Sequence, residues 1–436
     1  MTVLAVPEVA ARRPALLALL VLVVLAAVVV GLDTPWRVQP APPGGRTAVD
    51  PGRDFSPAEI AREDAFHAAI RPPAYAAIAL GVLTAAVLGL TPLGARLVAA
   101  VARPVGGGWA GQVLLGGLAL ALVGQLLGLP LAAWSEVVLR HYGLSTRDWF
   151  GWAADLAKSF GLGTGLTLAA LLGGYAVVRA APRTWWAWTG LGAATLVVAL
   201  SFGYPVLIEP VFNRFSSMPD GPLRTSLLQL AAGDGVPVRD VLVADASRRT
   251  TTLNAYVSGL GSTRRIVVYD TLLRRGSDEQ VRLVVAHELG HAKRHDVLRG
   301  TLVGALGVAA GACAAYLLLS WPALLARAGV GAAGDGRSVA LLLFLAVAAG
   351  LLLQPAQLLV SRRVEATADV HSLDLTRDPA GFVEMERHLA VANLADLNPN
   401  PVIYGLFSSH PTAPERIALA RDWARLHGGS AKATGE

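Results

Sequence analysis

The chain has 436 residues, of which 54% are hydrophobic and only 16% are charged, with a formal net charge of +6 at pH 7. Soluble domains carry about 25% charged residues, so this composition excludes an ordinary water-soluble protein, a disordered chain and a coiled coil. A single cysteine excludes an internal disulfide framework and a cysteine-based zinc knuckle. The cations are spread thinly along the chain, so we expect no nucleic-acid partner and a lipid bilayer as the surroundings.

Seven stretches without a charged residue are long enough to cross a bilayer core, which requires roughly 20 apolar residues per helix. They lie near residues 15–32, 74–95, 109–134, 159–178, 184–208, 301–326 and 338–361. The first stretch could instead be a signal peptide, since Arg12 and Arg13 precede it. Its apolar run is too long for that, and 31–34 is a poor cleavage site, so we expect a retained helix.

Two long polar tracts, at about 209–300 and 362–436, interrupt the apolar pattern. Only two of the seven predicted helices separate them, so the tracts can meet on one side of the membrane. The first tract reads as a mixed α/β unit. Its predicted elements are a helix at 223–232, short strands at 241–243, 250–257 and 265–269, and a helix from about 278.

These patterns divide the chain into four parts, with a weak amphipathic helix expected near 58–70 in the first connection. The parts are helices one to five with their loops (1–208), the α/β unit (209–300), helices six and seven (301–361) and a C-terminal segment (362–436). Cytoplasmic connections are enriched in arginine and lysine. The short connections on the two sides carry similar numbers, and Lys293, Arg294 and Arg363 beside the polar tracts favour a cytoplasmic location for both tracts and the C-terminus.

The most informative motif is His287-Glu288-Leu289-Gly290-His291. Positions i and i+4 of a helix share one face, so both imidazoles can bind one metal ion. A catalytic zinc ion takes three protein ligands and keeps one position for water. Glu288 is placed to act as general base toward that water, whose pKa falls to about 7 on zinc. The motif therefore predicts metal-dependent hydrolysis.

A third ligand has to come from another segment of the chain. Glu365 and Asp369 follow the seventh apolar stretch and again share one helix face. One of them can bind the metal while the other accepts a hydrogen bond from a ligand imidazole. Asp369 and His371 are rivals of Glu365 as the third ligand, and spacing alone does not choose among these residues.

Five motifs in this order resemble those of the integral-membrane CAAX prenyl proteases and their bacterial relatives, which are H-E-x-x-H zinc metallopeptidases. The motifs lie at 245–249, 254–259, 287–291, 365–369 and 409–411, the last followed by Arg416. The resemblance runs from about 205 to 417. It implies an α-helical integral membrane protein with seven transmembrane helices around an intramembrane chamber, and a small zincin-like α/β catalytic domain at the cytosolic end.

The resemblance also implies the metal chemistry of the site. It makes His287, His291 and Glu365 the ligands of one Zn²⁺ ion per chain, with Glu288 as the catalytic base. It places Asp369 behind the ligands as a hydrogen-bonding partner. His295 falls on the same helix face one turn later, and we expect a supporting or surface role for it.

Substrate binding is implied by three further parts of the resemblance. Asn254 and Ala255 are expected on an edge strand that holds an extended peptide by main-chain pairing, a mode in which backbone bonds give affinity and pockets give selectivity. His410 and Arg416 are expected near the scissile carbonyl, where they can stabilise the developing oxyanion. The expected partners are therefore a peptide or a membrane-protein segment in extended form.

The predicted function is that of a membrane zinc metalloendopeptidase. We do not extend prenyl specificity to this chain, because no motif in the sequence indicates a binding site for a prenyl group. The excess of arginine over lysine also suggests a bacterial genome of high G+C content, where protein prenylation is not expected. A heat-shock-type quality-control peptidase is the alternative enzyme, although such proteins usually have four helices. A non-catalytic scaffold or transporter would have a broken metal motif or charged residues inside the helices, and the sequence has neither.

Overall fold

A computed structural model describes residues 9–259 and 261–428. Within these ranges, seven helical spans are long and apolar enough to cross a membrane. They are α1 (Val9–Asp33), α3 (Pro57–Leu90), the run Trp109–His141 that ends in α6 (Gly117–His141), α7 (Trp149–Ala180), α8 (Trp185–Leu207), α13 (Asp296–Leu319) and α15 (Val339–Thr376). The predicted number and order of the membrane helices are confirmed.

Two of the predicted stretches end earlier than expected. The stretch at 74–95 breaks at Thr91, which is extended and whose hydroxyl accepts a hydrogen bond from the Leu93 amide at the start of α4 (Pro92–Ala102). The stretch at 301–326 is divided before Pro322, which begins the short α14 (Pro322–Arg327). Proline lacks an N–H and is tolerated in the first turn of a helix rather than in its interior. The amphipathic helix expected near 58–70 is the first half of α3.

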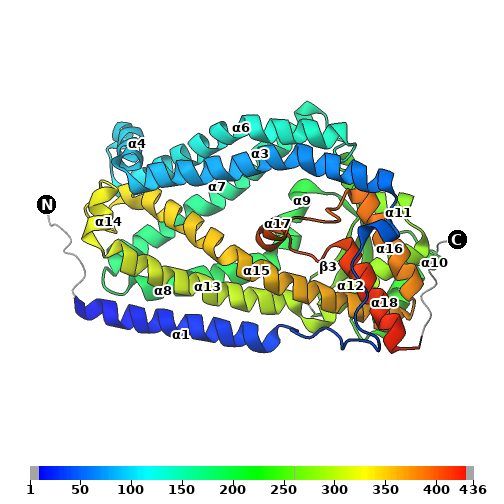
Figure 1. The fold of residues 1–436 in the computed structure, drawn as a ribbon. Coiled ribbons are helices and arrows are strands. Elements are labelled where there is room, and N and C mark those ends of the chain that lie inside the picture. Colours follow the sequence, from blue (N-terminus) through cyan, green and yellow to red (C-terminus); the bar gives the residue numbers. More distant parts are fainter. Residues whose placement is uncertain (1–8, 260, 429–436) are drawn as a thin grey trace.

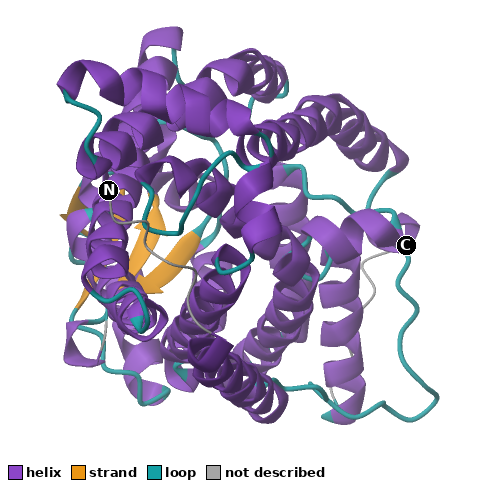
Figure 2. Ribbon diagram, turned by 90° about the vertical axis from the view of Figure 1, so that its left-hand side faces the viewer, coloured by secondary structure: helices purple, strands orange, loops and turns teal. Residues whose placement is uncertain are grey.

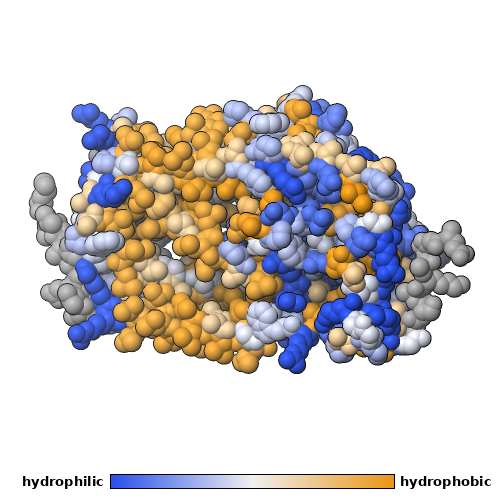
Figure 3. Space-filling model, in the orientation of Figure 1, coloured by the Kyte–Doolittle hydropathy of each residue, from blue (hydrophilic) through white to orange (hydrophobic). Residues whose placement is uncertain are grey.

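The long helices run side by side along the molecule, and seen end-on they surround a common interior (Figures 1 and 2). A cavity of about 650 Å³ lies between α3, α6, α7 and α15, and its walls are mainly apolar, as at Leu80, Leu120 and Phe344. Hydrophobic residues form a broad band over the helices, and hydrophilic residues gather at both ends (Figure 3). This distribution matches a membrane-embedded bundle with a hydrated domain at one end.

The first helix, α1, packs lengthwise against α13 (Figure 1). The Arg12 guanidinium donates a hydrogen bond to the Ser320 carbonyl at 2.6 Å, and Ala15 is fully buried. These contacts join α1 to the bundle.

The α/β unit contains a four-stranded sheet with the order β1-β2-β4-β3. The strands are β1 (Phe215–Ser217), β2 (Asp240–Ala244), β3 (Ala255–Ser258) and β4 (Arg265–Tyr269). β2 and β4 are parallel, whereas β1–β2 and β3–β4 are antiparallel, with Ala255 opposite Val268. β3 is therefore an edge strand.

Helices pack around this sheet and bury a core that includes Leu227, Ile266, Val285, Leu289 and Phe382. They are α10 (Pro222–Gly233), α11 (Asp270–Arg275), α12 (Asp278–Arg294), α16 (Pro379–Asn393) and α18 (Ala413–Leu426), and the short α2 (Pro51–Asp54), α9 (Glu209–Phe212) and α17 (Pro401–Phe407) complete this end of the molecule.

The strand predicted at 250–257 is wrong in its first half, because only its end belongs to β3. The Thr250 and Thr251 hydroxyls donate hydrogen bonds to the carbonyls of Leu144 and Gly143, at 3.0 and 2.8 Å. These bonds tie Thr250 and Thr251 to the connection that follows α6 rather than to β4.

α15 crosses the predicted boundary at residue 361 without a break. It is one helix of 38 residues, and it carries both the seventh apolar stretch and, near its end, Glu365 and Asp369. The membrane and the candidate site are thus joined by a single continuous helix.

Candidate active site

The metal motif lies on α12, whose start is fixed by local sequence. Ser277 and Gln280 form a capping box in which each side chain hydrogen-bonds to the backbone amide of the other. Val281, Val285 and Leu289, spaced four residues apart, are buried in the core of the α/β unit. The helix ends at His295, which adopts a left-handed conformation and whose ring lies 3.1 Å from the Arg264 guanidinium. His295 therefore ends the helix and takes no part in the histidine pair.

α12 packs closely against α15. A Cβ atom at Gly290 would lie 3.0 Å from the Cβ atom of His371, so the glycine permits this close approach. The Ser372 hydroxyl donates a hydrogen bond to the Leu283 carbonyl at 3.0 Å, which adds a second tie between the helices. The packing brings the two metal motifs, more than 70 residues apart in sequence, into contact.

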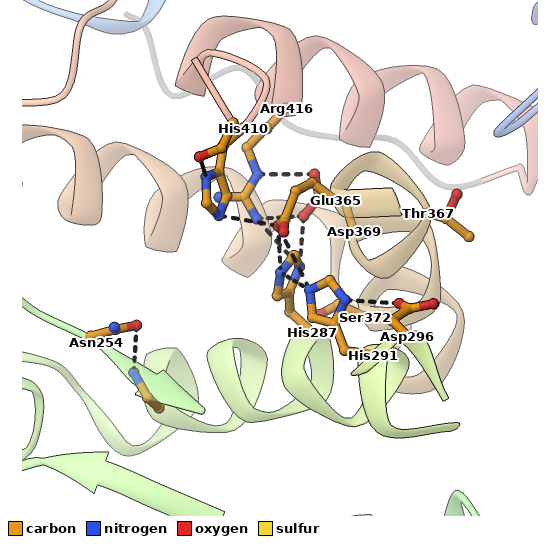
Figure 4. A network of polar contacts seen from close by, with 12 residues as sticks. Asn254, His287, His291, Asp296, Glu365, Thr367, Asp369, Ser372, His410 and Arg416 are labelled. Carbon is orange, nitrogen blue, oxygen red and sulfur yellow. Dashed lines mark hydrogen bonds and ion pairs between the residues drawn. The ribbon is translucent and has the colours of Figure 1, made fainter. Parts of the chain in front are cut away.

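His287, His291 and Glu365 converge on one point (Figure 4). The Nε2 atoms of the two histidines are 3.2 Å apart, and Oε2 of Glu365 lies 3.3 Å from the first and 3.7 Å from the second. His371, one of the rival third ligands, instead points its Nε2 atom to Asp234 at 2.9 Å. Of the three candidates, only Glu365 contacts both Nε2 atoms.

A carboxylate lies behind each histidine. Asp369 is 2.9 Å from Nδ1 of His287, and Asp296 is 2.9 Å from Nδ1 of His291. A hydrogen bond from Nδ1 to a carboxylate fixes the ring and leaves the Nε2 lone pair free for a metal. Sequence reasoning missed Asp296, which is the first residue of α13 and reaches His291 because the chain turns sharply at His295.

These residues fit a divalent metal ion. Oε2 of Glu365 is buried and, among the described residues, receives no hydrogen bond, although both imidazoles face it. A buried carboxylate oxygen without a donor is costly. A cation held between this oxygen and the two Nε2 atoms would satisfy all three, and two imidazoles with one carboxylate form a familiar catalytic zinc set.

The surrounding charges also favour a cation. Burial disfavours protonation of His287, but the neighbouring carboxylates of Asp369 and Glu365 outweigh this effect and raise its pKa to about 9. Burial also disfavours protonation of His291, but the carboxylates of Asp296 and Glu365 outweigh this effect and raise its pKa to about 10. Burial raises the pKa of the neighbouring Glu288, a shift in the direction that suits a proton acceptor working near neutral pH.

Arg416 lies on α18 behind the site, where two carboxylates surround its guanidinium. It forms a two-point pair with Asp369, and its Nη1 atom lies 2.8 Å from Glu386. Its Nη2 atom is also 3.3 Å from Nδ1 of His287. The guanidinium is therefore bound within the protein, and Glu386 is a buried partner that sequence reasoning missed.

His410 approaches Glu365 from the side opposite the two histidines (Figure 4). Its Nε2 atom lies 3.3 Å from Oε2 of Glu365, and Nδ1 is 2.8 Å from the Ser409 hydroxyl. The side chain is 59% exposed, so a substrate can reach it.

The edge strand β3 packs against α12. The Tyr269 amide donates a hydrogen bond to the Asn254 carbonyl at 3.0 Å, so Asn254 faces β4. Because bonding directions alternate along a strand, the backbone groups of Ala255 and Val257 face the open edge. The Ala255 amide presently donates to the side-chain oxygen of Asn254 at 2.9 Å, and the Ala255 side chain is buried.

Comparison with known proteins gives two adjoining family matches. Residues 217–424 match the family model for peptidase family M48, and residues 78–214 match that for the CAAX prenyl protease N-terminal region, described as five membrane helices. The chain is 32% identical over 305 residues to the uncharacterized metalloprotease YhfN of Bacillus subtilis, a match that covers 69% of this chain and 71% of that protein. The chain belongs to peptidase family M48.

Two further proteins extend the comparison. The match to CAAX prenyl protease 1 of Saccharomyces cerevisiae is 33% identical over 187 residues and spans 41% of this chain and 40% of the yeast protein. The crystal structure of S. mikatae Ste24p superimposes with a TM-score of 0.77 at 20% identity, covering 93% of this chain and 98% of that one. The M48 chain is thus a multi-pass membrane metallopeptidase with the Ste24 fold.

Proposed function

We propose that this M48 peptidase is a zinc endopeptidase in which His287, His291 and Glu365 hold the metal. The observation that carries the proposal is the buried Oε2 atom of Glu365, which faces two imidazole Nε2 atoms and has no hydrogen-bond donor among the described residues. Zinc at this point would lower the pKa of a coordinated water to about 7 and polarise the scissile carbonyl.

The remaining residues divide the chemical work. Glu288 follows His287 directly and is partly buried, so its carboxylate accepts a proton from the attacking water. His410 is exposed beside Glu365 and donates from Nε2 to the oxygen of the scissile carbonyl as negative charge develops there. The sequence places Arg416 near the scissile carbonyl, and in the structure Asp369 and Glu386 bind its guanidinium. We assign it to positioning Asp369 and, through it, His287.

The substrate binds as an extra strand on the open edge of β3. Ala255 and Val257 offer backbone groups there, and an unpaired edge is a template for an incoming extended chain. The peptide displaces the Asn254 side chain from the Ala255 amide, and the released amide group of Asn254 can bond to the peptide backbone.

The catalytic domain and both polar tracts lie on the cytoplasmic side, as the basic residues beside them favour. The natural substrate is a peptide or membrane-protein segment.

A quenched fluorescent peptide, incubated with the full-length protein in detergent, tests the proposal. Glu288→Gln should abolish cleavage and keep the metal, whereas His287→Ala should lose both. Glu279→Gln is the matched control, since Glu279 lies on the exposed part of the same helix. Full zinc occupancy in the His287→Ala protein, measured by elemental analysis, would refute the ligand assignment.

A further inference from the structure

A second group of metal-ligating side chains lies where α3 meets the segment that follows α16. Glu63 and His67 are one turn apart on α3, Asp396 follows α16, and a ligand atom of each lies within 4.8 Å of the others. None of these residues belongs to the active site. We propose that they bind a second divalent cation, of the Mn²⁺ or Zn²⁺ type, together with the carbonyl oxygen of Leu394.

The argument rests on Oε1 of Glu63. Glu63 is only 4% exposed, and its Oε1 atom lies 3.4 Å from Nε2 of His67, yet no donor in the described part of the chain hydrogen-bonds to it. The same Nε2 atom is closer, at 3.0 Å, to the Leu394 carbonyl. One N–H cannot serve both oxygens well, so one buried carboxylate oxygen is left without a partner, which is costly. A cation bound by Nε2 of His67, Oε1 of Glu63 and the Leu394 carbonyl oxygen would give every one of these atoms a partner.

The third side chain is held in place by its own ion pair. Arg71, one turn after His67 on α3, pairs with Asp396. A carboxylate has about four acceptor positions, so Asp396 can serve both Arg71 and a cation. One imidazole with carboxylate and carbonyl oxygens is a donor set that suits Mn²⁺ or Zn²⁺ and excludes soft ions.

The position suggests what the ion does. α3 has 34 residues and is therefore about 50 Å long, whereas the bilayer core is about 30 Å thick. Its first turns extend beyond the membrane and contact the catalytic domain, as the Arg387 guanidinium on α16 pairing with Glu59 also indicates. A cation at Glu63 and His67 would fasten the second membrane helix to the segment between α16 and α17.

Metal stoichiometry tests the proposal. The full-length protein, carrying no histidine tag, is equilibrated with Zn²⁺ or Mn²⁺, desalted and analysed by inductively coupled plasma mass spectrometry. Wild type should hold about two ions per chain, and Glu63→Gln and His287→Ala should each hold about one. In the His287→Ala background, the electron paramagnetic resonance signal of bound Mn²⁺ should disappear when Glu63→Gln is added.

Asp64→Asn is the matched control, because it removes the same charge from the exposed neighbouring position. It should leave about two ions bound. Asp396→Asn replaces Glu63→Gln if the latter does not yield folded protein. A wild type that holds one ion, lost entirely in His287→Ala and kept in Glu63→Gln, overturns the second site without affecting the active-site assignment.

Discussion

The carboxylate of Asp369 lies 2.9 Å from Nδ1 of His287, and the same carboxylate is held from behind by Arg416. Asp369 is fully buried, so its charge has to be matched by these neighbours. The pair links α15, which carries the proposed third ligand, to α12, which carries the first two. Several expectations depend on this link.

Asp369→Asn should weaken metal binding. The asparagine keeps the shape of the side chain but removes the charge that orients the His287 ring, and such changes behind a ligand typically cost about 10–100-fold in metal affinity or activity. Zinc titration against a chelator measures the affinity. His371→Ala is the comparison, since His371 bonds to Asp234 and should retain the metal. Metal loss in His371→Ala, with none in Glu365→Ala, would mean that the third ligand has been misassigned.

Arg416→Ala should reduce both stability and metal affinity. Removing the guanidinium leaves Asp369 and Glu386 buried without their cation, and breaking a buried pair in this way costs about 3–5 kcal/mol. Thermal melting in detergent and zinc titration measure the two effects. Arg421→Ala is the control that separates the loss of stability from the loss of zinc affinity. Arg421 lies on the same helix as Arg416 but pairs with the buried Asp54, away from the metal. It should melt earlier yet bind zinc normally, and equal zinc losses in the two variants would argue against a positioning role for Arg416.

Gly290→Ala should loosen the metal centre. The added Cβ would lie 3.0 Å from the Cβ of His371, so α12 and α15 would have to move apart by a few tenths of an ångström. This shift separates the histidines from Glu365, and we expect zinc affinity to fall at least about tenfold, or about 1.4 kcal/mol. Gly300→Ala is the control, since no heavy atom lies within 4 Å of a Cβ built there. Unchanged zinc binding in Gly290→Ala would show that zinc affinity does not depend on the close approach of α12 and α15 at this glycine.

Substitutions on β3 should impair substrate binding without affecting the metal. Ala255→Pro removes an amide that faces the open edge and makes no bond to β4, so the sheet should tolerate it. We expect Ala255→Pro and Asn254→Ala each to lower kcat/KM at least about tenfold, about 1.4 kcal/mol of transition-state stabilisation. Peptide kinetics, zinc content and a melting curve are measured together. Normal turnover in both variants would contradict strand addition at this edge.

Orientation can be tested with single cysteines. The one native residue, Cys313, is buried in α13, and a Cys313→Ser background permits labelling at chosen sites. A cysteine at Gly331, between α14 and α15, should react with an impermeant maleimide added to intact cells. A cysteine at Gly276, before α12, should react only after lysis. The reverse pattern would place the catalytic domain outside the cell. A reporter fused after Glu436, which lies outside the described residues, independently measures on which side of the membrane the C-terminus lies.

The sequence predicts the membrane helices well because each is a continuous apolar run, and it predicts the histidine pair because both residues lie four positions apart on one helix. It cannot predict Asp296, whose position depends on the left-handed turn at His295. Glu386 is equally hidden, because it reaches the site through Arg416 on another helix. The early part of the 250–257 segment is misassigned since tertiary hydrogen bonds to Leu144 and Gly143 override its strand propensity.

Because α15 is continuous, a change in its tilt within the membrane would be transmitted to the candidate site. Glu365 lies about 40 Å along the helix from Val339, at a rise of 1.5 Å per residue, while the two histidines are carried by a helix outside the bilayer. A tilt of α15 by only about 1° about its far end therefore displaces the carboxylate by about 0.7 Å, several times the roughly 0.2 Å tolerance of a metal–ligand distance. Membrane helices tilt in response to bilayer thickness. We therefore expect turnover in reconstituted vesicles to change with the acyl-chain length of the lipid.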